Sequence, residues 1–150
     1  IRIGVHLAED SAESEALELV PPAAVLGIGC RKGVSAEAIE SAYVGFFRDA
    51  GVHEAAVSAV ASIDVKKDEP GIVRFAGLRS RPFTTFSSDQ LAAVPGTFTG
   101  SAFVEKTVGV DSVSERSAVL AAGGGRLLVG KTVFPGLTMA MAMKEFVVDF

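Results

Sequence analysis

Apolar and polar positions alternate along the chain in a way that predicts strands and helices in turn. Residues 23–28 form an uninterrupted apolar run, which is typical of a strand buried on both faces in an α/β fold. Between Ser35 and Gly51, apolar residues recur at helical spacing. This pattern predicts a helix that Ser35 caps and that ends before Gly51.

The middle of the chain repeats this order of strand and helix. Residues 55–63 are rich in alanine and valine and predict a second strand. Pro70 suits the first turn of a helix, and the apolar face that follows it ends before the next proline. Residues 82–86 predict a third strand, and Ser87 with Gln90 fits a capping box at the start of a short helix.

The last third of the chain predicts two short helices and a hairpin. A loop at 96–100 precedes the helices, and the predicted bounds are 102–108 and 114–122 for the helices, and 126–134 and 137–146 for strands joined at Pro135-Gly136. Strands and helices in alternation, closed by a hairpin, predict the α/β class. We expect a three-layer α/β/α domain with a mixed β-sheet and a C-terminal β-hairpin.

Length and composition are consistent with one domain over residues 1–150. The chain has 150 residues, 49% of them hydrophobic, enough for a single core. Residues 9–18 are acidic and alanine-rich, and Pro21-Pro22 follows them. We therefore expect residues 1–22 to form a loosely packed leader and residues 23–150 to form the core.

Charge and cysteine content exclude several classes of function. The net charge of −4 argues against nonspecific binding to nucleic acid. Cys30 is the only cysteine, so no intramolecular disulfide and no thiol-rich metal site is expected, and the cytoplasm is the default location. No apolar run is long enough to cross a membrane. Neither a metal nor a cofactor is expected.

The glycine-rich segment 27–33 lies where the first buried strand meets its helix. Glycine N–H groups, the helix start and the cations Arg31 and Lys32 together could bind an anion. A tight turn with solvated basic side chains explains the same residues equally well. Cys30 has two possible roles, a thiol whose pKa the nearby cations lower and a small buried residue.

A second cluster of charges follows the strand predicted at 55–63. Asp64, Lys66 and Glu69 would lie at the carboxyl end of that strand, where ligands bind in open α/β sheets. These side chains could orient a substrate or act as a general base. A solvated turn before an acidic helix start is the other interpretation.

Two further patterns favour structural interpretations. Residues 125–132 match the letters of a phosphate-binding P-loop, but they read as a strand with no helix after them, which argues against nucleotide binding at Lys131. Ser114 and Glu115 fit an N-cap with an acidic first turn. Phe98 is either a core residue or, in its glycine-flanked loop, a cover for a flat ligand.

Four segments in this order resemble the CobE and CbiG C-terminal family of cobalamin biosynthesis. They are residues 27–33 (GIGCRKG), 62–71 (SIDVKKDEPG), 113–118 (VSERSA) and 137–142 (LTMAMA). The family commonly has a proline where this chain has Arg116. The resemblance extends over residues 25–142 and leaves the leader uncovered.

The resemblance implies a role in building the corrin ring of vitamin B12. Longer CbiG proteins carry a further N-terminal region and are linked to opening a δ-lactone on cobalt-precorrin-5A, with release of a two-carbon aldehyde. With 150 residues, the chain is expected to lack that region and is similar to the short CobE form. The implied ligand is a carboxylate-rich tetrapyrrole or corrinoid intermediate, and other cobalamin-pathway enzymes are implied partners.

The family segments and the charge clusters together nominate the site residues. A corrinoid is flat, apolar in the middle and rimmed by carboxylates, which suits glycine N–H groups and local cations. The expected substrate-binding residues are Gly29, Cys30, Arg31, Lys32, Gly33, Lys66, Ser114 and Thr138. The expected catalytic residues, if a lactone is opened, are Asp64, Glu69 and Glu115.

Overall fold

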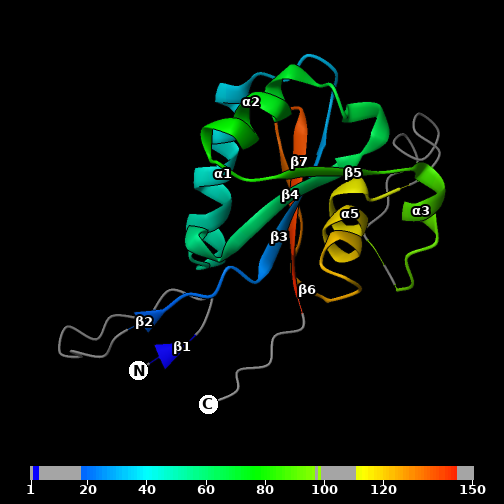
Figure 1. The fold of residues 1–150 in the computed structure, drawn as a ribbon. Helices are drawn as coiled ribbons and strands as arrows, with labels where there is room; N and C mark the ends of the chain where they lie inside the picture. Colours follow the sequence, from blue (N-terminus) through cyan, green and yellow to red (C-terminus); the bar gives the residue numbers. More distant parts are fainter. Residues whose placement is uncertain (1, 4–17, 97, 99–110, 145–150) are drawn as a thin grey trace.

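The computed structural model, which describes residues 2–3, 18–96, 98 and 111–144, is built on a five-stranded mixed sheet (Figure 1). The strand order is β5-β4-β3-β7-β6. Strands β3, β4 and β5 are parallel, whereas β7 runs antiparallel to both β3 and β6. Their bounds are β3 Ala24–Cys30, β4 Val57–Ile63, β5 Phe83–Phe86, β6 Arg126–Phe134 and β7 Leu137–Met143.

Helices cover both faces of this sheet. Helices α1 (Ala36–Ala50) and α2 (Pro70–Leu78) pack on one face, and α3 (Ser88–Ala92) and α5 (Val113–Ala121) pack on the other (Figure 1). The expected three-layer α/β/α domain with a mixed sheet and a C-terminal hairpin is confirmed.

The short elements are β1 Arg2–Ile3, paired in parallel with β2 Glu18–Leu19, and the 3-10 turns η1 Glu54–Ala56 and η2 Asp64–Lys66. The division between leader and core stays a prediction.

The two faces of the sheet differ in side-chain size. Leu26 and Ile28 of β3 pack with the aromatic side chains of α1 and α2, as do the methionines of β7. The next residues along each strand point to the opposite face, where most of them are small: Gly27, Gly29, Ala61, Ala140 and Ala142. Val25 and Ile63 are the larger side chains on that face. Helix α5 packs closely against it, because a Cβ built on Gly27 would be 1.8 Å from the backbone oxygen of Ser114.

Local capping signals predicted most helix ends correctly. The Ser35 hydroxyl accepts a hydrogen bond from the Ala38 N–H, and Gly51 ends α1. Ser87 and Gln90 form the predicted capping box of α3. Helix α5 was placed wrongly by one residue at each end, since Ser112 and not Ser114 occupies the N-cap position.

The hairpin turn is the expected Pro135-Gly136. Phe134 pairs with Leu137, so the loop has two residues, and Gly136 has a φ of 78°. Proline followed by a glycine at positive φ is the composition of a type II turn. Strand β7 ends at Met143, earlier than predicted, and residues 145 and 146 lie outside the described residues. So do the helix expected at 102–108 and most of the loop at 96–100.

The segment with the letters of a P-loop is part of β6. Lys131 lies within this strand, and the hairpin to β7 follows it. A P-loop needs a turn between a strand and a helix N-terminus, so this position cannot cradle a phosphate in that way. The expectation that the pattern is structural is confirmed.

Candidate functional site

Segments that are far apart in the sequence meet at the carboxyl end of β3, near the top of the view in Figure 1. Because β7 is antiparallel to β3, its first residues Leu137 and Thr138 pair with the last residues of β3, Cys30 and Gly29. The Arg31 N–H donates to the backbone oxygen of Gly136 over 2.9 Å. We call this region, with the loop 31–35 and the starts of η2, α2 and α5, the β3 edge.

Glu69 ties the glycine-rich loop to α2. Gly33 has a φ of 84°, and its N–H donates to Glu69 Oε1 over 2.7 Å. Gly71 brings the two segments together, because a Cβ there would lie 2.1 Å from the backbone oxygen of Val34. The protein's own carboxylate therefore occupies one of the backbone donors that the sequence suggested for a ligand.

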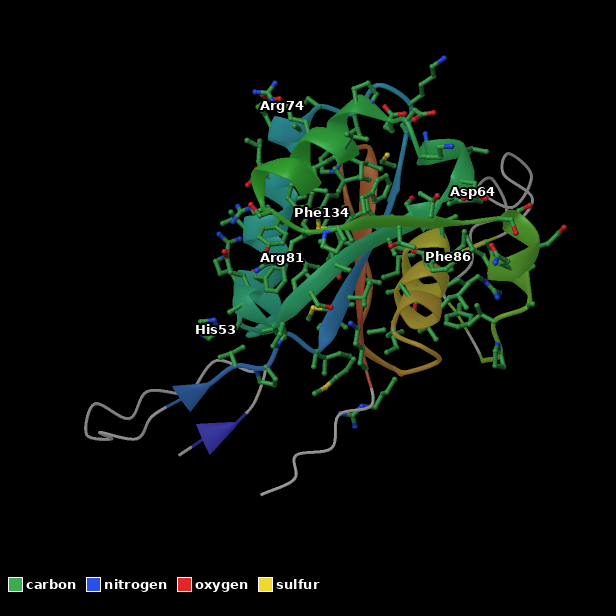
Figure 2. All side chains as sticks on the ribbon, viewed as in Figure 1. His53, Asp64, Arg74, Arg81, Phe86 and Phe134 are labelled. Atoms are coloured by element: carbon green, nitrogen blue, oxygen red, sulfur yellow. The ribbon has the colours of Figure 1, made fainter. Side chains whose placement is uncertain are left out.

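Lys66 completes this cluster. Its Nζ lies 3.8 Å from Glu69 Oε2, and both side chains are mostly buried, at 14% and 8% exposure. Burial of a charge is tolerated where an opposite charge and hydrogen bonds accompany it. The other predicted polar residues, Arg31, Lys32 and Asp64, are exposed, and Figure 2 shows Asp64 beyond the end of β4. The edge thus has an internal ion pair and a solvent-facing set of charges.

Cys30 lies on the α1 and α2 side of β3, partly buried against the core. Burial raises the pKa of its thiol to about 11; Lys66 lowers it and Glu69 raises it, both by smaller amounts. The thiol is therefore protonated near neutral pH. A buried small residue, rather than a thiol whose pKa the nearby cations lower, is the interpretation that the structure supports.

Gly29, Ser114 and Thr138 lie together on the opposite face of β3. A Cβ built on Gly29 would be 2.9 Å from Thr138 Oγ1 and 3.8 Å from the Ser114 nitrogen. The Thr138 hydroxyl is 3.5 Å from the Gly29 backbone oxygen, at the limit of a hydrogen bond. The Ser114 side chain is buried, and its hydroxyl has no hydrogen-bond partner among the described residues.

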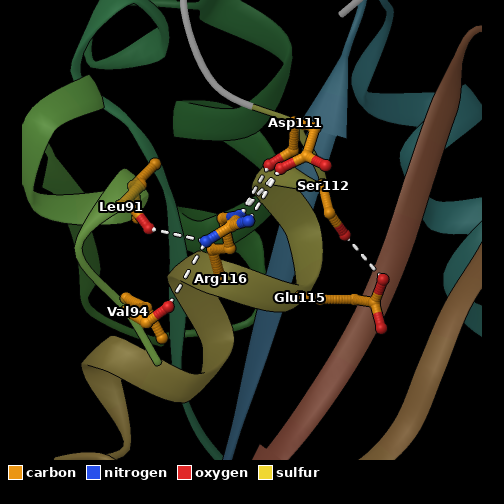
Figure 3. Close-up of polar contacts among 6 residues, drawn as sticks. All are labelled: Leu91, Val94, Asp111, Ser112, Glu115 and Arg116. Atoms are coloured by element: carbon orange, nitrogen blue, oxygen red, sulfur yellow. Dashed lines mark hydrogen bonds and ion pairs between the residues drawn. The ribbon is translucent and has the colours of Figure 1, made fainter. Parts of the chain in front are cut away.

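Glu115 and Ser112 form a buried polar contact at the start of α5, shown in Figure 3. The Ser112 hydroxyl donates to Glu115 Oε1 over 2.6 Å. Ser112 has a φ of 48°, a left-handed conformation that is uncommon for a residue with a side chain. Glu115 is 2% exposed, so the structure places this predicted catalytic carboxylate inside the protein.

Arg116 joins the start of α5 to α3 (Figure 3). Its guanidinium pairs with Asp111 at 2.8 Å and donates to the backbone oxygens of Leu91 and Val94 at 3.2 and 3.4 Å. It also lies over the ring of Phe98, 4.6 Å from the centroid. Phe98 is partly buried and packs against the core under α5, as its interpretation as a core residue predicted, and it also stacks on Arg116.

Comparison with known proteins identifies the family. Residues 24–142 match the family described as the cobalamin synthesis G C-terminus. The chain belongs to this family. All four segments that suggested the resemblance lie within the matched residues, so the predicted resemblance is confirmed.

Two solved structures of cobalamin biosynthesis proteins share the fold of this family member. In the crystal structure of CobE, the sequence is 35% identical to this chain and the fold matches with a TM-score of 0.74. The match covers 81% of this chain and 89% of CobE. Protein ChiG of Agrobacterium tumefaciens is 32% identical with a TM-score of 0.64, covering 82% and 99%.

The curated relatives of the family are longer proteins. The cobalt-precorrin-5A hydrolase of Salmonella typhimurium is 36% identical over 116 residues, which are 77% of this chain and 32% of that protein. A cobalt-precorrin-5A hydrolase of Priestia megaterium is 28% identical over 123 residues. The chain spans about a third of the length of these relatives.

Two kinds of feature are absent from the described part of the chain. No helix there is long and apolar enough to cross a membrane. No three histidine, cysteine or acidic side chains among them gather in a way that could hold a metal ion.

Sequence reasoning did not single out two features that shape the site of this family member. Ser112 followed three residues later by Glu115 is the letter pattern of a capping box and could have located the start of α5. Gly71 carried no such signal, because its close approach to Val34 depends on how α2 packs against a loop distant in sequence.

Proposed function

We propose that this chain binds a carboxylate-rich corrinoid intermediate of cobalamin biosynthesis at the β3 edge and protects it or hands it on to other enzymes of the pathway. The observation that carries the proposal is the meeting of the four family segments at one end of the sheet. Ligands in open α/β sheets bind at the carboxyl ends of the strands. The single cysteine is consistent with a cytoplasmic protein, which remains our proposed location.

The cations at this edge support a ligand with carboxylates. Arg31 and Lys32 are exposed beside Gly33, and Lys66 lies just inside them. Because the chain as a whole carries a charge of −4, an anionic ligand must be attracted by such a local cluster. Glu69 holds Lys66 and the loop in place, which leaves Arg31 and Lys32 as the side chains available to the ligand.

Equilibrium titration with cobyrinic acid, a corrinoid that has free carboxylates around its rim, tests this proposal. Each of Arg31→Ala and Lys32→Ala should weaken binding roughly 3- to 10-fold at low salt, because a charge-assisted hydrogen bond is lost at a partly solvated site. Arg48→Ala is the matched control, since Arg48 is exposed on α1 and, among the described residues, pairs with its neighbour Asp49 alone. Unchanged affinity in both loop variants would remove the site.

Hydrolysis of a lactone-bearing precorrin is the second candidate, favoured by the names of the curated relatives. The three candidate carboxylates have different surroundings: Asp64 is exposed, Glu69 is bonded to Gly33 and Lys66, and Glu115 is buried with Ser112. A general base must reach an attacking water in the complex. Asp64, which is exposed, therefore fits that role better than Glu69, whose oxygens already have partners, or Glu115, which is buried and accepts from Ser112.

Acetaldehyde release from the authentic lactone substrate tests this second candidate. Hydrolysis predicts turnover by the purified chain and its loss in Asp64→Ala, with Glu69→Ala and Glu115→Ala acting through the folding of the loop and of the start of α5. Corrinoid binding without any aldehyde release would exclude hydrolysis and leave the binding proposal in place.

A further inference from the structure

Helix α5 begins without a side-chain cap. Ser112 occupies the N-cap position, but its hydroxyl donates to Glu115, and within the described part of the chain no side chain caps the helix. The first N–H groups of a helix have no partners inside the helix, and they favour negative charge. Helix α5 has nine residues, long enough for this effect to be present at its start.

Ser114, in the first turn, carries a buried hydroxyl for which the described residues offer no partner. It is 1% exposed, and its Oγ makes no hydrogen bond there. Nearly all buried polar groups in proteins are hydrogen-bonded, and one that is not calls for an explanation. Ser117, one turn later on the same helix, shows the ordinary behaviour, since its hydroxyl contacts the backbone oxygens of Ala61 and Ser114.

Gly29 lies beneath this turn with no side chain between its backbone and Ser114. A Cβ at Gly29 would come within 2.9 Å of Thr138 Oγ1, closer than a Cβ normally approaches, and would be 3.8 Å from the Ser114 nitrogen. Gly29 and Thr138 are both partly exposed, at the end of β3 where Ser114 begins its turn. The Glu115 carboxylate points elsewhere: its Oε1 accepts from Ser112, and its Oε2 lies 3.9 Å from a Cβ built on Gly130 of β6.

We infer that Ser114, Thr138 and Gly29 form a second subsite, which binds one rim carboxylate of the corrinoid on the α5 side of β3. The subsite donates hydrogen bonds from the Ser114 N–H and hydroxyl and from the Thr138 hydroxyl. The loop that carries Arg31 and Lys32 contacts α2 through Gly33 and Val34 and leads into α1, so the ligand straddles the end of β3 and places carboxylates on both sides. This inference rests on the proposed corrinoid binding.

Ser114→Ala tests the subsite through two measurements on the full chain. Because the hydroxyl has no partner among the described residues, its removal should leave the melting temperature unchanged or raise it, whereas the affinity for cobyrinic acid should fall about fivefold or more. Ser117→Ala is the matched control: it removes bonded contacts, so it should lower the melting temperature and leave the affinity unchanged. Gly29→Ala places a methyl group against the Thr138 hydroxyl and should weaken binding like Ser114→Ala.

The possible results separate this inference from the proposed function. Wild-type affinity in Ser114→Ala and in a folded Gly29→Ala, with binding still weakened by Arg31→Ala, would overturn the subsite alone. A melting temperature that falls in Ser114→Ala as it does in Ser117→Ala, with affinity unchanged, would also overturn it. Absence of binding by the wild-type chain would overturn the proposed function and this inference together.

Discussion

At Gly27 and Gly71, the backbone of another element occupies the place where a side chain would begin. A Cβ would meet the Ser114 oxygen at 1.8 Å in the first case and the Val34 oxygen at 2.1 Å in the second. The sequence suggested that glycines of the segment 27–33 offer N–H groups to a ligand. The structure gives Gly27 a different role, because it lies in β3 under α5. A glycine's role depends on what packs against it, and that is not visible along the chain.

Two glycines of α2 provide a matched test of whether a glycine's role depends on the backbone that packs against it. Gly71→Ala should destabilise the protein by about 1–3 kcal/mol, because backbone must shift to admit the methyl group. Gly77→Ala, in the same helix and with nothing within 4 Å of its Cβ position, should stabilise by about 0.4–1 kcal/mol. Urea denaturation measures both. Equal changes in the free energy of unfolding for the two substitutions would contradict the close approach of Gly71 to the Val34 backbone.

Cys30 should make the protein less stable at alkaline pH. Its pKa is about 11 in the folded state against an ordinary value of 9.0, so the folded state holds its proton more tightly. The stabilisation is fully present below pH 9 and is lost as the pH rises through 11, since unfolding then releases a proton.

Comparison with Cys30→Ala isolates this effect, because burial also raises the pKa of Tyr43, to about 12. The difference in free energy of unfolding between wild type and Cys30→Ala should be constant below pH 9 and fall between pH 9 and 11. A constant difference across this range would show that the thiol titrates normally in the folded protein.

At the scale of elements, Arg79 joins three segments of the chain. It follows α2 directly, donates to Glu40 of α1 and to Glu54 of η1, and lies 4.5 Å from the centre of the Tyr43 ring. These contacts hold α2 against α1 and so support the loop that α2 contacts through Glu69 and Gly71.

Loss of these Arg79 contacts should lower the free energy of unfolding measurably. Arg79→Ala should cost about 1–2 kcal/mol, because two carboxylates lose a partner that is only partly solvated. Arg48→Ala should change stability by less than about 0.5 kcal/mol, since the Arg48 side chain is 75% exposed. Chemical denaturation measures the free energy of unfolding of both variants. If Arg79→Ala lowers it no more than Arg48→Ala does, the contacts of Arg79 with Glu40, Glu54 and Tyr43 do not stabilise the protein.

The elements themselves were largely predictable because their signals are local. Ser35, Ser87 and Gly51 stand next to the helix ends that they determine, and each prediction is confirmed. The start of α5 was misplaced because Ser112 and Ser114 are both plausible caps, and their choice depends on packing against β3. Contacts such as Gly33 to Glu69 and Arg79 to Glu40 join residues 36 and 39 positions apart, so no local pattern reveals them.

For the whole molecule, strand order decides where the proposed site lies. The sequence predicted a mixed sheet and a hairpin, but not that β7 pairs with β3 and so brings Thr138 beside Gly29. Because β3 is central, the loop after it contacts α2 on one face of the sheet, the start of α5 packs on the other face, and both lie at the carboxyl end of β3. The family segments predicted which stretches of the chain to consider for ligand binding. The structure indicates which of these stretches lie on the α1 and α2 face of the sheet and which lie on the α5 face.

The most direct test of corrinoid binding at the β3 edge is a crystal structure of the full chain with cobyrinic acid. We expect the corrin ring at the end of β3, with rim carboxylates within hydrogen-bonding distance of Arg31 and Lys32 on one side and of Ser114 on the other. A corrinoid bound away from this edge, for example against β6 or the outer surface of α1 and α2, would contradict the account.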